Sequence, residues 1–72
     1  MYSNGHINRK IERFLIQYNM PATKFGRLVA SDPRLVLDMR NGRELRGPMI
    51  NRAEAFMTAY STMIAHDLAQ VA

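Results

Sequence analysis

The stretch that decides the fold covers residues 20–42 and reads MPATKFGRLVASDPRLVLDMRNG. Pro21 fits the opening of a helix, because its missing N–H would lack a partner in the first turn anyway. Apolar residues then share one helical face: Phe25, Leu28 and Val29. This spacing predicts a helix over 22–30.

A second start signal follows at once in Asp32-Pro33, where the Asp carboxylate can accept from first-turn amides and Pro takes the first helical position. The run 35–37 would suit a short strand on composition alone, but the caps and the spacing of Val36 and Met39 favour a helix over 33–40. Asn41-Gly42 is flanked by no alternating strands, so it is interpreted as a helix end with left-handed residues.

The segment before this stretch has the pattern of an amphipathic helix over 7–18. Its apolar positions are Ile7, Ile11, Phe14, Leu15 and Tyr18. Asn4 or Asn8 can cap its start, and Met20-Pro21 ends it, because a residue before proline avoids the helical region.

After a basic loop over 43–48, apolar residues recur every three or four positions to the end of the chain. They are Ile50, Ala53, Met57, Tyr60, Ile64, Leu68 and Val71. The pattern predicts one helix over about 49–70, or two helices with a bend. A continuous helix from 50 to 70 would be about 30 Å long, more than a three-helix core can cover. We therefore expect something else to bury its far end.

Length limits the protein to one small domain, and the helical patterns above predict that it is all-α, with four to five helices. The chain has 72 residues and no cysteine, and it contains no apolar run near the roughly 20 residues of a membrane span. Its amino terminus also lacks the apolar stretch of a signal peptide. We expect a cytoplasmic protein without a membrane partner.

Catalytic and metal sites find little support. His6 and His66 lie far apart in the sequence without carboxylates at metal-ligand spacing, and Ser61 with His66 has no third group to orient it. The methionines are better explained as side chains that fill gaps in a core or in a subunit contact than as part of a cofactor site. The expectation is a protein that is not an enzyme, with no metal, cofactor or evident small-molecule ligand.

Positive charge is concentrated in the middle of the chain, which carries a net charge of +4 in total. Between 24 and 52 there are seven basic residues, six of them Arg, against three acidic ones, whereas 53–72 contains no Lys or Arg. Guanidinium groups pair bidentately with phosphates, so this excess suits a polyanion. A solvated basic face that only aids solubility is the alternative.

The residues of 20–42 resemble the phage repressor and Cro class of helix-turn-helix proteins. The resemblance rests on Phe25 and Val29 as core residues of the first motif helix, on Gly26 as the small residue at the helix crossing, and on Val36 and Met39 in the second helix. Asn41-Gly42-Arg43 follows as in the family. The match covers about a third of the chain, with the motif over 22–41. Ala30 stands where the family most often has Gly, so either Ala30 is strained or the turn differs.

The resemblance implies a small, repressor-like transcription regulator of a phage or bacterium that is associated with the nucleoid. Its helix over 33–40 would enter the DNA major groove. The base-reading positions are Pro33, Arg34, Leu37 and Asp38, which are not the amide-rich residues common in the family. Arg34 would read guanine or contact a phosphate, and Leu37 would meet a thymine methyl group or pack in the core in place of Leu35. Asp38 would accept from cytosine or hold a neighbouring Arg.

The remaining contacts are assigned to phosphates and to a second copy of the chain. Thr23, Lys24, Arg27, Arg40, Arg43 and Arg46 are the phosphate candidates, each with a solvated charge as the alternative. Met57, Tyr60, Ile64 and Leu68 are the expected homodimer contacts on the final helix. The alternative functions are a protein-interaction module without DNA binding and a non-specific architectural DNA-binding protein.

Overall fold

A computed structural model describes residues 4–71, with side chains described from residue 5 to residue 68. Within this part the chain forms four helices and no strand: α1 (Asn4–Gln17), α2 (Ala22–Ala30), α3 (Leu35–Arg40) and α4 (Gly47–Val71). The expected small all-α domain with a long carboxy-terminal helix is confirmed. No helix in the described residues combines the length and apolarity needed to cross a membrane.

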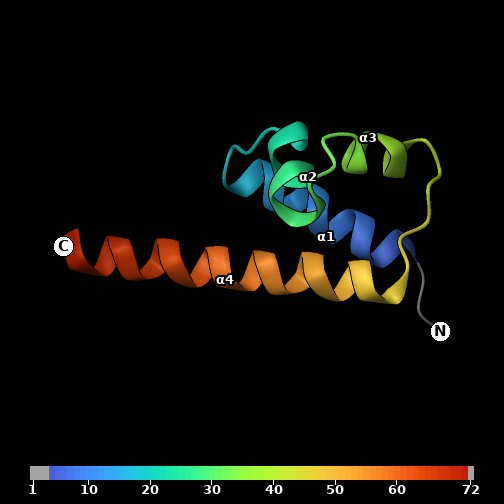
Figure 1. Cartoon of the computed structure of the whole chain (residues 1–72). Helices are drawn as coiled ribbons and strands as arrows, with labels where there is room; N and C mark the ends of the chain where they lie inside the picture. Colours follow the sequence, from blue (N-terminus) through green and yellow to red (C-terminus); the bar gives the residue numbers. More distant parts are fainter. Residues whose placement is uncertain (1–3, 72) are drawn as a thin grey trace.

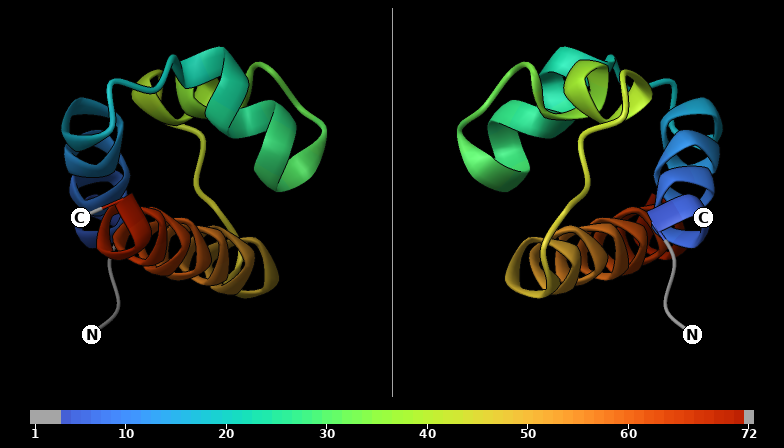
Figure 2. Two further views of the ribbon diagram at one scale, coloured as in Figure 1. Left: turned by 90° about the vertical axis from the view of Figure 1, so that its left-hand side faces the viewer. Right: turned by 90° about the vertical axis from the view of Figure 1, so that its right-hand side faces the viewer.

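The helices surround one core, and α4 extends well beyond it. α2 and α3 lie on one side of the molecule and α4 on the other, with α1 joining the two at one edge (Figure 2). α1 and α2 both pack against α4, and the carboxy-terminal part of α4 projects past the other helices (Figure 1). This projection gives the molecule its elongated extents of 42 × 26 × 19 Å.

The first two helices begin and end close to the predicted residues. α1 starts at Asn4 rather than at residue 7, so Asn8 lies inside the helix and does not cap it. Its end is closed by Asn19, whose φ of 50° is left-handed, and by the Met20 amide, which donates to the Leu15 carbonyl at 2.9 Å. α2 has the predicted bounds.

The expected start of α3 at Pro33 is wrong by two residues. Pro33 and Arg34 form a turn, and the helix begins at Leu35. Asp32 still supplies the start signal, because its carboxylate accepts from the Arg34 amide at 3.1 Å and its carbonyl accepts from the Leu35 amide at 3.1 Å. The segment 35–37 is helical, so the strand alternative is excluded.

α3 ends at Arg40, and the positive φ of Gly42 two residues later closes the helix. Gly42 has a φ of +103°, and its amide donates to the Met39 carbonyl at 3.1 Å while the Arg43 amide donates to the Asp38 carbonyl at 2.9 Å. Asn41 has a φ of −95°, so only one of the two residues expected to be left-handed is so.

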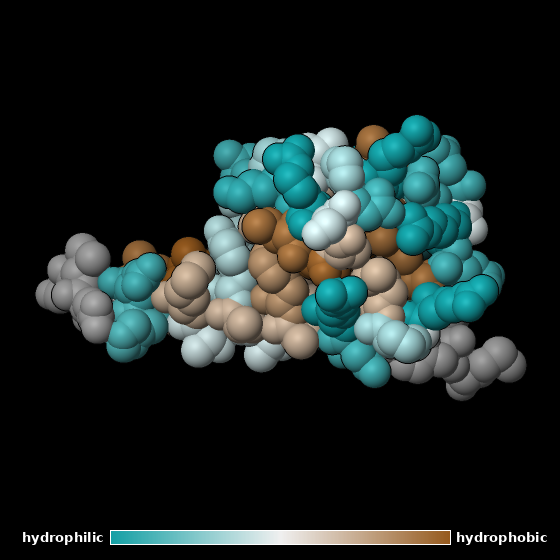
Figure 3. All heavy atoms as spheres, in the orientation of Figure 1, coloured by the Kyte–Doolittle hydropathy of each residue, from teal (hydrophilic) through white to brown (hydrophobic). Residues whose placement is uncertain are grey.

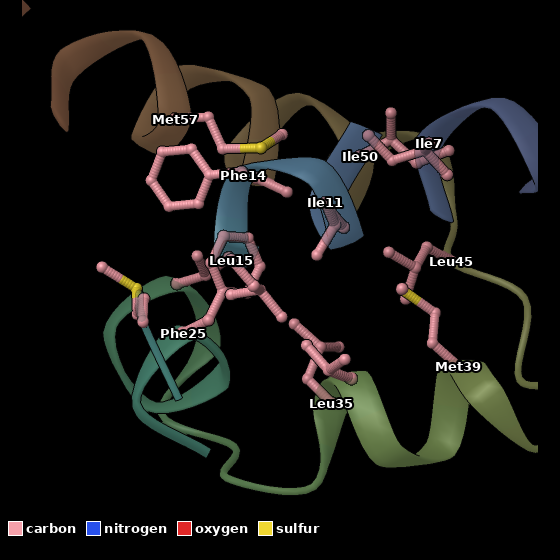
Figure 4. Packing of buried hydrophobic residues seen from close by; sticks show 14 residues of the cluster. Ile7, Ile11, Phe14, Leu15, Phe25, Leu35, Met39, Leu45, Ile50 and Met57 are labelled. Atoms are coloured by element: carbon pink, nitrogen blue, oxygen red, sulfur yellow. The ribbon is translucent and has the colours of Figure 1, made fainter. Parts of the chain in front are cut away.

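All four helices and the loop before α4 contribute to the core. Its buried residues are Ile7, Ile11, Phe14, Leu15, Met20, Phe25, Val29, Leu35, Val36, Met39, Leu45, Ile50, Ala53 and Met57. Phe14 and Phe25 lie among these core side chains (Figure 4). The Phe14 ring lies 5.7 Å from that of Phe25 and 5.5 Å from that of Tyr60, at the centre of an aromatic group. Burial of each large apolar side chain stabilises the fold by about 1.5–3 kcal/mol. Leu28, expected on the core face of α2, is instead 53% exposed.

The long helix α4 is continuous, so the alternative of two helices with a bend is excluded. Its amino-terminal half buries Ile50, Ala53 and Met57, whereas Leu68 further along is 67% exposed. Met57 therefore belongs to the core of its own chain, and its assignment to a dimer interface is corrected. Hydrophobic residues also lie on the projecting half of α4 (Figure 3). The residue Val71 of the apolar pattern lies outside the part with described side chains.

Candidate nucleic-acid interface

The crossing of α2 and α3 depends on the absence of a side chain at Gly26. A Cβ atom built there would lie 2.2 Å from the Asp32 carbonyl oxygen and 3.1 Å from the Leu35 Cβ. No larger residue fits without moving the backbone that leads into α3. Phe25 and Val29 on one helix, and Val36 and Met39 on the other, are buried as the sequence predicts.

The turn between these helices differs from the expected one at a single residue. Ala30 ends α2 in helical conformation, and Ser31 carries the left-handed backbone, with φ 53° and ψ 31°. The Ser31 amide donates to the Arg27 carbonyl at 3.0 Å and the Asp32 amide donates to the Gly26 carbonyl at 3.1 Å. Ala30 is therefore unstrained. Of the two alternatives from the sequence, a strained Ala30 or a different turn, the second is correct.

The start of α3 presents an arginine and a leucine to solvent. The Arg34 side chain is 78% exposed, and Leu37, three residues later on the same face, is 40% exposed. Leu35 is fully buried, so the alternative with Leu37 in the core and Leu35 outside is excluded. Pro33, in the turn, is also exposed.

Two aspartates hold the basic side chains around this turn. Arg43 donates from Nη1 to Asp32 at 2.9 Å and reaches Asp38 at 3.4 Å, so it ties the loop after α3 back to the turn before it. Asp38 also lies 3.8 Å from the Arg34 guanidinium. The hydrogen bond from Arg43, with a second from the Arg34 amide, holds the pKa of Asp32 below its ordinary value. Of the two roles considered for Asp38, contact with a neighbouring Arg is present in the chain itself.

Arg40 is held by a bidentate pair with α1. Its Nε and Nη2 donate to the two carboxylate oxygens of Glu12 at 2.7 and 2.8 Å. This hydrogen bonding lowers the pKa of Glu12 and raises that of Arg40. Arg40 and Arg43 therefore have partners within the chain, which the charge pattern of the sequence did not predict.

The other phosphate candidates are exposed without such partners. Thr23, Lys24, Arg27 and Arg46 all lie at the surface of α2 or of the loop before α4. Lys24, Arg27 and Arg46, the three cations among them, make no ion pair with a described residue. Their charge is available to an external anion.

A second basic surface was missed from the sequence. Arg9, Lys10 and Arg13 on α1 line a groove between α1 and α4, together with His6. The helical pattern of 7–18 already shows that these residues avoid the apolar face, but nothing in the sequence indicates which helix lies beside them. The part of the chain with described side chains contains no cluster of three His, Asp or Glu residues able to hold a metal ion.

Comparisons with known proteins identify no family for this chain. No family model, curated protein or solved structure matches it. A functional assignment therefore rests on the geometry and charge of the residues described above.

Proposed function

We propose that the protein is a sequence-specific regulator that binds double-stranded DNA through the start of α3. The observation that supports this proposal most strongly is the exposed side chain of Arg34 at the amino-terminal end of α3, a helix that packs closely against α2 at Gly26. An α-helix fits the major groove of B-DNA, and side chains at its amino-terminal end reach the base edges. The proposal also agrees with the basic character of 24–52.

Arg34 is the proposed base reader. Its guanidinium can donate two hydrogen bonds to guanine O6 and N7, a contact worth about 1–3 kcal/mol of discrimination. Asp38 lies within 3.8 Å of it and would restrict its rotamers, which favours one direction of approach to the base. Leu37, exposed on the same face, would meet an apolar thymine methyl group.

The candidate phosphate contacts fall into two groups: cations without an acidic partner and arginines that already pair with a carboxylate of the chain. Lys24, Arg27 and Arg46 have no acidic partner among the described residues, so they are the strongest candidates, with the Thr23 hydroxyl beside them. Arg40 and Arg43 first stabilise the position of α3 through Glu12 and Asp32. A phosphate could then bind only their remaining N–H groups, so we rank them below the other three.

A homodimer through the projecting half of α4 is part of the proposal. Leu68 is 67% exposed and Ile64 is half-buried, and no Lys or Arg occurs in 53–72 to attract DNA to this region. A second copy would bury these residues and present two copies of α3 about 34 Å apart, one turn of DNA. Sedimentation should show a dimer, which Leu68→Glu dissociates. A wild-type monomer at high micromolar concentration, with and without DNA, would remove this part of the proposal.

A selection of bound sites from a pool of random duplexes tests the proposed function. We expect a recurring sequence to emerge, with binding that weakens steeply as salt rises because phosphate contacts release counterions. Binding with the same salt slope but no preferred sequence would indicate an architectural protein instead.

The exposed apolar face of α4 favours a second candidate, a protein-interaction module that docks this helix into a partner's groove. Such a module would show no salt-dependent binding to any duplex. The same selection experiment therefore separates all three functions.

A further inference from the structure

The groove between α1 and α4 has the size and lining of a small-molecule site. Its volume is about 840 Å³, within the range of roughly 300–1,000 Å³ usual for sites that bind organic ligands. It is separate from the α2–α3 surface and uses none of the residues proposed to contact DNA. We therefore considered what its own side chains can bind.

One wall of the groove is cationic and incompletely neutralised. Lys10 lies 3.9 Å from Glu54, but Arg9 and Arg13 make no ion pair with any described residue. Arg9 and Arg13 are four residues apart on α1, where like charges repel and slightly destabilise a helix. An anion bound between them would remove this repulsion.

The opposite wall offers hydroxyl groups from α4. Ser61 Oγ accepts a hydrogen bond from the Tyr18 hydroxyl at 2.9 Å, so the proton of Ser61 remains able to donate. Thr62 donates to the Thr58 carbonyl at 2.9 Å, and Thr58 itself is exposed where it lines the groove. Two hydroxyl donors thus lie across the groove from two guanidinium groups.

The remaining lining includes apolar groups, Phe14 and Met57, which belong to the core and are each 5% exposed. A bare inorganic anion would make no use of them. Base recognition in a DNA duplex needs a protein element that enters a DNA groove, whereas these cationic groups line a groove between two helices of the protein itself.

We propose that the groove binds a small organic anion, in which a phosphate or carboxylate group is attached to an apolar body. The anion lies between Arg9 and Arg13 and accepts from the hydroxyls of Thr58 and Ser61. The apolar body lies over the small exposed parts of Phe14 and Met57 and the methylene groups of the other lining side chains. This site is independent of the proposed DNA binding.

Titration of the ¹⁵N-labelled protein with 1-naphthyl phosphate, followed by amide NMR shifts, tests the proposal. We expect saturable shifts confined to amides of α1 and of residues 57–62. Inorganic phosphate, which lacks the apolar body, and 1-naphthol, which lacks the anionic group, should both bind more weakly. Absence of saturable shifts in the groove would overturn the proposal. Equal affinity for inorganic phosphate or for 1-naphthol would overturn it as well.

A double variant and a charge-matched control identify the site. Arg9→Gln with Arg13→Gln should weaken 1-naphthyl phosphate binding at least tenfold, whereas Lys24→Gln with Arg27→Gln removes the same charge and should leave it unchanged. Unperturbed amide peaks in the same spectra show whether each variant is folded. An equal loss in both variants would overturn the proposal in favour of non-specific attraction by net charge. Because the control pair removes proposed phosphate contacts, its effect on DNA binding is read separately.

Discussion

The two halves of α4 share one apolar pattern but have different surroundings. Up to Met57, every apolar position of the pattern is buried in the core, whereas the same face is partly exposed at Ile64 and largely exposed at Leu68. The spacing of apolar residues therefore specifies a helix and its face, but the chain's own core covers only part of that face. We expect substitutions in the two regions to have very different effects.

The largest expected effect is the loss of a central aromatic side chain. Phe25 is fully buried and its ring lies 5.7 Å from Phe14 and 5.6 Å from Phe56, so Phe25→Ala should lower the free energy of unfolding by about 3–5 kcal/mol. Leu68→Ala should change it by less than about 0.5 kcal/mol at low protein concentration. Urea unfolding of both variants measures the difference, and similar losses would contradict the contrast between the covered core and the exposed end of α4.

A somewhat smaller effect is expected at the crossing of α2 and α3. Gly26→Ala places a Cβ atom 2.2 Å from the Asp32 carbonyl oxygen, so the turn must shift, at a cost of roughly 3 kcal/mol. Gly47→Ala is the matched control, because nothing lies within 4 Å of a Cβ atom there. Thermal unfolding should separate the two variants clearly. If Gly26→Ala proved as stable as the control, the close crossing would be disproved.

The smallest expected effect concerns the pair that joins α1 to α3. Glu12 has a lowered pKa because Arg40 donates to its carboxylate, so the pair stabilises the fold fully above the ordinary value of 4.5 and loses this contribution as the pH falls through the lowered value. The pair is partly exposed, and Glu12→Gln should cost only about 0.5 kcal/mol at pH 7. The difference between wild type and variant should disappear in unfolding curves at low pH. A difference that persisted there would show that the ion pair is not its cause.

Local signals predicted much of the fold but did not determine the turn between α2 and α3. The bounds of α2 and the burial of Val36 and Met39 follow from caps and spacing within a few residues. The turn was harder, because the choice of Ser31 over Ala30 for the left-handed position depends on hydrogen bonds to carbonyls one turn back.

The candidate site shows the same limit. The place of Arg34 at the start of a helix predicted its exposure, but the choice between Leu35 and Leu37 as the buried residue stayed open until the structure showed Leu35 in the core. The engagement of Arg40 was not, because its partner Glu12 lies 28 residues away in the sequence. The α1–α4 groove was missed for the same reason, since its two walls come from opposite ends of the chain.

The most direct test of the central claim is the sequence preference of an Arg34→Ala variant. Competition between a selected duplex and a scrambled one, at fixed salt, should show the variant losing about fivefold to 150-fold of the wild-type preference, which corresponds to about 1–3 kcal/mol. Arg27→Ala, which removes a proposed phosphate contact, should weaken binding to both duplexes equally. If Arg34→Ala retained the full preference, α3 would not read the bases and the proposed function would be wrong.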